Sequence, residues 1–148
     1  MSSSTKWPLY ALLAWAGSIP FVGVALLALA GVERLPLLGP LDGIVSSYAL
    51  LIVSFMAGTH WGLAVAHLRE RVSRLLIASN AIALAAWIGY LLAPADVSAA
   101  VSAGAFAVLL AVDYRLKERR AIDAAYLAVR RNVTLVVIAA LVLFVLAG

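Results

Sequence analysis

Five long apolar segments dominate this chain of 148 residues and limit what it can fold into. Each is about as long as the roughly 20 residues that a helix needs to cross a hydrocarbon core about 30 Å thick. Apolar residues make up 66% of the chain and charged residues 12%, against about 45–50% and 25% in soluble domains. We therefore predict an all-α integral membrane bundle of about five transmembrane helices in a single domain (1–148), with spans at about 9–32, 43–67, 75–92, 97–116 and 128–147.

The segments between these spans have the composition of loops. Residues 33–42 contain Pro36, Gly39 and Pro40, which predict a turn-rich connection rather than a continuing helix. Residues 69–74 form a charged loop, and 93–96 a tight turn containing a proline. The mixed stretch 117–131 fits either an interfacial helix or an extension of the fifth span.

The first span could instead be a signal peptide, because residues 28–30 resemble a cleavage site made of small residues. Its apolar region is longer than the usual 7–15 residues of a signal peptide, so we expect a retained helix with a kink near Pro20.

The basic residues are distributed very unevenly over the two predicted sides. With five spans, Arg34 falls on one side and the other ten Lys and Arg residues on the opposite side, namely Lys6, Arg69, Arg71, Arg74, Arg115, Lys117, Arg119, Arg120, Arg130 and Arg131. The positive-inside rule then places the N-terminus in the cytoplasm and the C-terminus outside.

The polar residues of the spans gather in the predicted inner half of the bilayer. We expect a polar pocket there, built from His60, Asn80, Asp113 and Arg130. Ionisable residues within a membrane usually face the bundle interior and pair with one another, so Asp113 and Arg130 are a candidate pair. The alternative is that Asp113 pairs with Arg115 or Lys117 close to the interface. Because 133–148 alone is too short to span, the fifth helix should start before Arg130.

His60 has three readings: a hydrogen-bonded structural residue, a group that handles a ligand or a proton, or a metal or haem ligand. The only other histidine, His67, lies seven residues away, or about 10.5 Å along a helix, so the two cannot ligate one iron. We expect no metal site and no cofactor.

Motifs of common enzymes are missing from the sequence. GxSxG, HExxH, P-loop and GxGxxG patterns do not occur, and the chain has no cysteine, which excludes thiolate catalysis and iron–sulfur clusters. We therefore predict no catalytic residues and no enzyme activity. The basic residues sit at helix ends without an aromatic platform, so we do not expect nucleic-acid binding.

The second span carries small residues at every fourth position: Ser54, Gly58, Gly62 and Ala66. Such a ridge lets another helix approach closely, and it includes a GxxxG pattern. It predicts packing within the bundle or, alternatively, a homodimer interface. Trp61 lies within this stretch beside His60, away from the helix ends near which most of the other Trp and Tyr residues fall.

The stretch from Tyr48 to Gly62, YALLIVSFMAGTHWG, resembles the signature of a family of small membrane proteins known only as a domain of unknown function. The family occurs in proteobacteria and, in animals, as a mitochondrial transmembrane protein. The resemblance rests on Tyr48, Ser54, Phe55, Gly58, His60, Trp61 and Gly62, and later on Asp113, Tyr126, Leu127 and Arg130; Ala125 departs from it where an aromatic residue is expected. It implies a bacterial inner membrane and adds Tyr126 to the candidate pocket, but it implies no activity.

Two functions fit these observations best. The first is an accessory subunit or assembly factor of a larger membrane complex, such as a respiratory one, that docks through the small-residue ridge. The alternative is a binder or transporter of a quinone, lipid or proton-coupled solute that uses the inner-leaflet pocket. A receptor or scaffold role and an unrecognised enzyme remain as further alternatives.

Overall fold

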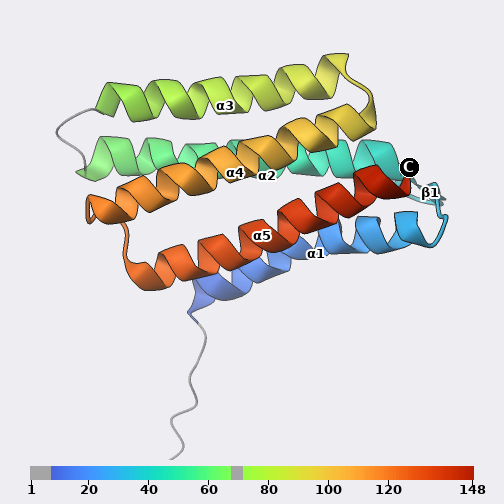
Figure 1. The fold of residues 1–148 in the computed structure, drawn as a ribbon, viewed down its shortest axis with the longest axis horizontal. Coiled ribbons are helices and arrows are strands. Elements are labelled where there is room, and N and C mark those ends of the chain that lie inside the picture. Colours follow the sequence, from blue (N-terminus) through green and yellow to red (C-terminus); the bar gives the residue numbers. More distant parts are fainter. Residues whose placement is uncertain (1–7, 68–71) are drawn as a thin grey trace, which may run out of the picture.

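Five helices run antiparallel to their chain neighbours along one long axis (Figure 1). This computed structural model describes residues 8–67 and 72–148. All five helices are long and apolar enough to cross a membrane, which confirms the predicted all-α class and the number of spans. They are α1 (Leu9–Leu29), α2 (Leu41–His67), α3 (Val72–Leu92), α4 (Ala95–Glu118) and α5 (Ala124–Ala147).

The helices end where the backbone or a cap requires it. α1 ends at Leu29, three residues before the predicted end of the span at 32. Gly31, with a φ of 75°, lies in the turn that follows. Arg120, with a φ of 58°, ends the turn after α4. Asp123 then caps α5 by accepting the backbone N–H of Tyr126 at 2.6 Å. The fifth helix therefore starts before Arg130, as expected, and residues 124–131 extend the span.

The connection between α1 and α2 is a small hairpin, in which β1 (Arg34–Leu35) pairs with β2 (Gly39–Pro40). The tight turn predicted at 93–96 is present, because α3 ends at Leu92 and α4 begins at Ala95. Arg74 lies in the first turn of α3 rather than in a loop, while Lys6, Arg69, Glu70 and Arg71 lie outside the described residues.

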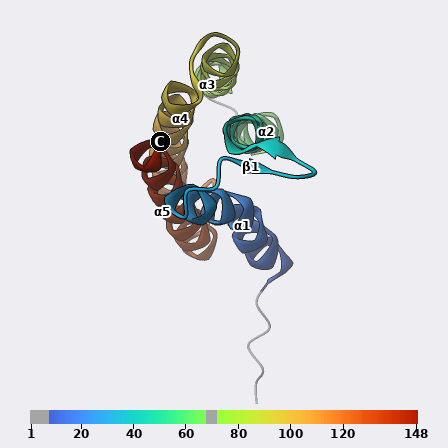
Figure 2. The same cartoon turned by 90° about the vertical axis from the view of Figure 1, so that its right-hand side faces the viewer.

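The helices pack in an open arrangement when seen along the axis (Figure 2). α5 packs against both α1 and α4, whereas α3 packs against α2 and α4. α1 and α2 share the least extensive contact among these helix pairs. That contact includes a hydrogen bond from the Tyr48 hydroxyl to the Gly17 carbonyl, 3.0 Å long, and a tilted packing of the Phe21 and Tyr48 rings, whose centroids are 5.0 Å apart.

One face of α2 supplies a large part of the core. Ala49, Val53, Ala57, His60 and Ala64 are all buried, and their spacing of three or four residues places them on one side of the helix. Ala49, Val53 and Ala57 contribute to the apolar core, whereas His60 is a buried polar residue. The inner face of α2 therefore changes from apolar to polar toward one end of the bundle.

Candidate functional site

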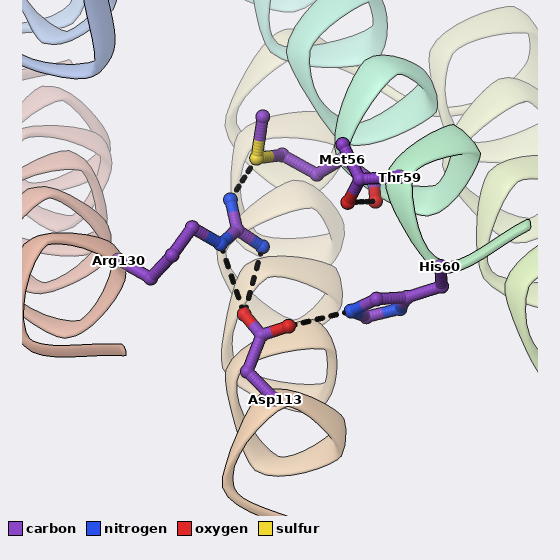
Figure 3. Close-up of polar contacts among 5 residues, drawn as sticks. All are labelled: Met56, Thr59, His60, Asp113 and Arg130. Atoms are coloured by element: carbon purple, nitrogen blue, oxygen red, sulfur yellow. Dashed lines mark hydrogen bonds and ion pairs between the residues drawn. The ribbon is translucent and has the colours of Figure 1, made fainter. Parts of the chain in front are cut away.

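Three ionisable side chains from three helices meet at this polar end (Figure 3). His60 Nε2 lies 2.6 Å from Asp113 Oδ1. Arg130 Nε and Nη2 both lie 2.9 Å from Asp113 Oδ2. We call His60, Asp113 and Arg130 the polar cluster. The predicted pair between Asp113 and Arg130 is present, and Asp113 is not paired with Arg115 or Lys117.

Helical periodicity brings the three residues inward. On α4, Leu109, Asp113 and Leu116 are buried at spacings of four and three residues. On α5, Arg130 follows the buried Leu127 by three residues and precedes the buried Thr134 by four. Each charged side chain therefore belongs to the stripe that faces the other helices.

The cluster lies about two helical turns below one end of the bundle. At about 1.5 Å per residue, His60 lies about 10 Å before the end of α2, Asp113 about 8 Å before the end of α4 and Arg130 about 9 Å after the start of α5. We call this end, where α4 stops and α5 starts, the basic end; it carries Arg115, Lys117, Arg119, Arg120 and Arg131.

The polar cluster is almost completely buried. His60 and Asp113 each expose 1% of their surface and Arg130 exposes 8%. An isolated charge at such a depth is strongly destabilising, and an opposite charge in hydrogen-bond contact offsets that cost. Asp113 therefore neutralises Arg130 while it also accepts a hydrogen bond from His60.

The donors and acceptors of the cluster do not all find partners. A carboxylate only accepts, so His60 Nε2 carries the proton it shares with Asp113, and Nδ1 of a neutral ring then holds a lone pair. Among the residues the structure describes, that buried Nδ1 has no hydrogen-bond partner.

Arg130 also has unused capacity. A guanidinium has five N–H groups. Two are directed to Asp113 and one to the sulfur of Met56, which is a weak acceptor. Within the described part of the chain, two N–H groups of Arg130 are left without an acceptor.

Arg130 lies on the wall of a cavity of about 270 Å³. We call this cavity the α1–α2 groove. Its lining comes from four helices, and its polar members lie toward the basic end. The lining residues are Tyr10, Leu13, Ala14, Gly17, Ile52, Phe55, Met56, Thr59, Phe106, Tyr126, Val129, Arg130, Val133, Thr134 and Val137.

The groove opens on the outer surface of the bundle. Leu13 of α1 and Phe55 of α2 both line it, and they are 63% and 64% exposed. Because both side chains line the cavity and are also largely exposed, they lie at its rim. Because these surfaces face lipid in a membrane, the groove is open sideways to the acyl chains.

A second cavity, of about 400 Å³, lies beside the turn between α4 and α5. It shares Tyr10, Thr59 and Tyr126 with the groove and adds Leu63 and residues 121–123. The rings of Tyr10 and Tyr126 pack with their centroids 5.9 Å apart, at the junction of the two cavities. The second cavity therefore adjoins the groove at this aromatic pair, on the side of the basic end.

Two of the residues predicted for the pocket lie elsewhere. Asn80 is exposed and donates to the Leu76 carbonyl of its own helix at 2.8 Å. It follows the buried Ser79, and one residue along a helix turns a side chain by about 100°. Trp61 is 46% exposed beside the buried His60 for the same reason. Tyr126, in contrast, lines both cavities.

The small-residue ridge points away from the bundle. Ser54, Gly58, Gly62 and Ala66 are all exposed. A Cβ atom added to Gly58 or Gly62 would meet no atom within 4 Å. The expectation that the ridge packs within the bundle is therefore wrong for this fold, because α2 uses its opposite face for the core.

The structure also brings residues to the site that the sequence did not single out. Met56 and Thr59 of α2 and Tyr10 and Gly17 of α1 line the groove. Of these, Met56 was predictable from the sequence of the second span, because it lies one helical turn from His60. The α1 residues give no such signal, because only the packing of α1 against α5 brings them here.

The residues around the cluster offer little to a metal ion. In the described part of the chain, no group of three or more His, Cys, Asp or Glu side chains is placed to hold one. His60 and Asp113 are adjacent, but the Asp113 carboxylate is already shared with a guanidinium cation. The arrangement instead suits a ligand that accepts hydrogen bonds from Arg130.

Five membrane-spanning helices around a buried His–Asp–Arg cluster define a small multi-pass membrane protein. The chain belongs to the family of proteins of unknown function DUF3429, which it matches over residues 7–146. This match covers both parts of the motif noted in the sequence and confirms the resemblance. No curated protein and no solved structure matches the chain.

Proposed function

We propose that this protein binds a membrane-soluble amphiphile in the α1–α2 groove, with the polar head of the ligand at Arg130 and its apolar body along the groove. The observation that carries the proposal is the position of Arg130. It is 8% exposed, lines the groove and has more N–H donors than the cluster has acceptors for.

The chemistry of the groove matches an amphiphile. Away from the basic end its walls are apolar, with Leu13, Ile52, Phe106 and Val137, which suits an acyl or isoprenoid chain. Toward the basic end they include Thr59, Tyr126 and Arg130, which suit carbonyl, carboxylate or phosphate oxygens. Quinones and lipids both have this division, and the lateral opening gives such molecules entry from the bilayer.

The same proposal assigns a location and an orientation. We place the protein in a bacterial inner membrane with its basic end toward the cytoplasm, because Lys and Arg residues concentrate there. The head of the ligand then lies at the depth of the inner leaflet. The role is one of binding or transfer, and it needs no catalytic residue.

The experiment is native mass spectrometry of the protein extracted in a mild detergent, with variants that fill the groove without disturbing the polar cluster. Gly17 lines the groove, and its missing Cβ would meet no atom within 4 Å, so Gly17→Leu should occupy the groove without a clash. We expect it to reduce co-purified amphiphile at least about tenfold, which corresponds to about 1.4 kcal/mol of lost affinity.

Two variants control for general effects. Gly23→Leu adds the same side chain to α1 outside the groove lining, again without a close neighbour. Arg131→Gln removes the arginine next to Arg130, which is exposed and donates to Asn132. Both should retain the ligand. The proposal would be contradicted if the wild-type protein carried no quinone or lipid in a defined stoichiometry, and only the non-specific lipid that any membrane protein retains in detergent.

A second function is supported by a different observation. The exposed small-residue ridge on α2 is a surface to which another membrane helix can pack closely, as an accessory subunit or assembly factor of a larger complex, such as a respiratory one, requires. A second copy of this chain could use the same surface. This role is compatible with ligand binding, because none of the four ridge residues lines the groove.

The same purification tests this second role through its protein content. A partner present in stoichiometric amount should be lost from Gly62→Leu, in which the bulky side chain blocks close helix approach, and retained by Gly17→Leu. A protein that purifies alone and monomeric in both variants and in the wild type would leave only the binding role.

A further inference from the structure

The charge balance of the polar cluster restricts which ligands the groove can accept. With a neutral His60, the charges of Asp113 and Arg130 sum to zero. An anionic head that accepts hydrogen bonds from the two spare N–H groups of Arg130 adds one negative charge to a site that is more than nine-tenths buried. An uncompensated buried charge is strongly unfavourable, so a cation must appear with it.

Among the nitrogen atoms of the cluster, only Nδ1 of His60 can take up a proton while every contact to Asp113 is kept. Both carboxylate oxygens of Asp113 already accept hydrogen bonds, and Arg130 is fully protonated. Nδ1 of His60 holds a lone pair, is buried and has no partner among the described residues. A proton added there creates an imidazolium whose Nε2–H still donates to Asp113.

We propose that the groove takes up an anionic amphiphile together with one proton, with the acidic head at Arg130 and the proton on Nδ1 of His60. This inference rests on the proposed function and names its ligand class, an apolar chain with a carboxylate- or phosphate-type head. The proton comes from water and forms a new N–H bond at Nδ1, so the occupied site is electrically neutral: two cations, His60 and Arg130, balance Asp113 and the ligand.

The surroundings of His60 contain few other groups that could change this balance. α4 contributes Asp113, and α5 contributes Arg130 and Tyr126. Titratable and charged residues elsewhere on the helices packed against α2 are Tyr10 on α1, Arg74 and Tyr90 on α3, and Asp96, Tyr114, Arg115, Lys117 and Glu118 on α4; all of these are exposed.

The second cavity gives the proton a short path. It lies beside the turn between α4 and α5, at the basic end, and reaches Thr59 and Tyr126. Thr59 also lines the groove. A proton can therefore come from the aqueous side at the basic end as far as Thr59 and Tyr126, the latter one helical turn from Arg130, while the ligand enters sideways from the bilayer.

The test measures binding of hexadecanesulfonate to the protein in nanodiscs between about pH 5 and pH 8, the range in which histidine titrates. A sulfonate remains anionic throughout this range, so any pH dependence belongs to the protein. We expect the affinity to increase as the pH falls, approaching tenfold per pH unit, since one proton is bound with each ligand. A pH indicator in weak buffer should report uptake of about one proton per ligand.

Two variants assign the proton to a residue. His60→Gln keeps an amide N–H to donate to Asp113 but cannot take up a proton, so its affinity for the sulfonate should not vary with pH. His67→Gln removes the only other histidine and should retain the wild-type slope. The indicator measurement uses wild-type protein, so it decides the question even if His60→Gln does not fold.

Neutral and short probes separate the possible failures. Hexadecanamide should bind with an affinity that does not depend on pH, and methanesulfonate, which lacks the chain, should bind at least about a hundredfold more weakly than hexadecanesulfonate. Proton coupling is overturned if the affinity for hexadecanesulfonate does not depend on pH, or if His60→Gln keeps the wild-type dependence of affinity on pH. In either case, binding of hexadecanamide would still support the proposed function. If neither long-chain probe binds, the proposed function fails as well. Equal binding of methanesulfonate would assign the site to a soluble anion instead.

Discussion

Asp113 connects three helices through one carboxylate. It accepts hydrogen bonds from His60 of α2 and Arg130 of α5 while it belongs to α4. Its 1% exposure keeps both contacts away from bulk solvent. At the residue scale, the same contacts link the three helices and set the charge that the proposed ligand would meet at Arg130.

Asp113→Asn should be strongly destabilising. The amide has nearly the shape of the carboxylate, but it leaves the Arg130 guanidinium buried without a counter-charge. We expect the free energy of unfolding to fall by about 3–5 kcal/mol, the usual cost of removing one partner of a buried pair. Unfolding by SDS in mixed micelles, followed by tryptophan fluorescence, measures it.

The double variant Asp113→Leu with Arg130→Leu is the control for that prediction. It removes both charges, and well-packed apolar residues often replace a buried pair without loss of stability. It should recover most of the stability lost in Asp113→Asn. An Asp113→Asn protein as stable as the wild type would show that the cluster does not hold the helices together.

At the scale of helices, the contacts divide α2 into two faces with different roles. Ala49, Val53 and Ala57 face the core, whereas Gly58 and Gly62 face outward. Helical glycines therefore occur both on outward surfaces and at close helix contacts in this chain. Gly89 of α3 allows close approach of α4, because a Cβ there would lie 3.2 Å from Val101 Cγ1.

Leucine substitutions at these two kinds of glycine should differ clearly. Gly89→Leu should lower the free energy of unfolding by about 1–3 kcal/mol, because the added side chain overpacks the α3–α4 contact. Gly58→Leu should change it by no more than about 0.5 kcal/mol, because it projects into open space. SDS unfolding of the monomer measures both, and a large loss in Gly58→Leu would show that the ridge packs within the fold.

At the scale of the whole molecule, the asymmetry of charge predicts how the bundle sits in the membrane. The β1–β2 hairpin and the α4–α5 turn lie at opposite ends of the long axis (Figure 1). The basic residues concentrate at the second of these ends. The positive-inside rule therefore predicts that the hairpin is outside the cell's cytoplasm.

Because the chain has no cysteine, single cysteines can test this orientation directly. Leu37 in the hairpin is 97% exposed, and Glu118 at the end of α4 is also exposed. In intact bacterial spheroplasts, a membrane-impermeant maleimide should label Leu37→Cys at once and Glu118→Cys only after permeabilisation. The reverse pattern would place the basic end, and the proposed ligand head, on the outer side.

Several properties of this fold could be predicted from the sequence because they are local. Span number follows from hydropathy and the length of a helix in a bilayer, and the start of α5 before Arg130 follows from the same length. The pairing of Asp113 with Arg130 was predictable because ionisable groups at that depth need partners. Tyr126 was added only through the family resemblance.

The tertiary structure alone decided which faces of the helices meet. In lipid, apolar residues on the inner and outer faces of a helix differ little, so hydropathy does not distinguish them. The sequence therefore could not tell that Asn80 and Trp61 turn outward, that the ridge on α2 is exposed, or that α1 packs against α5. That last contact, between helices far apart in the chain, creates the groove and brings Arg130 to its wall.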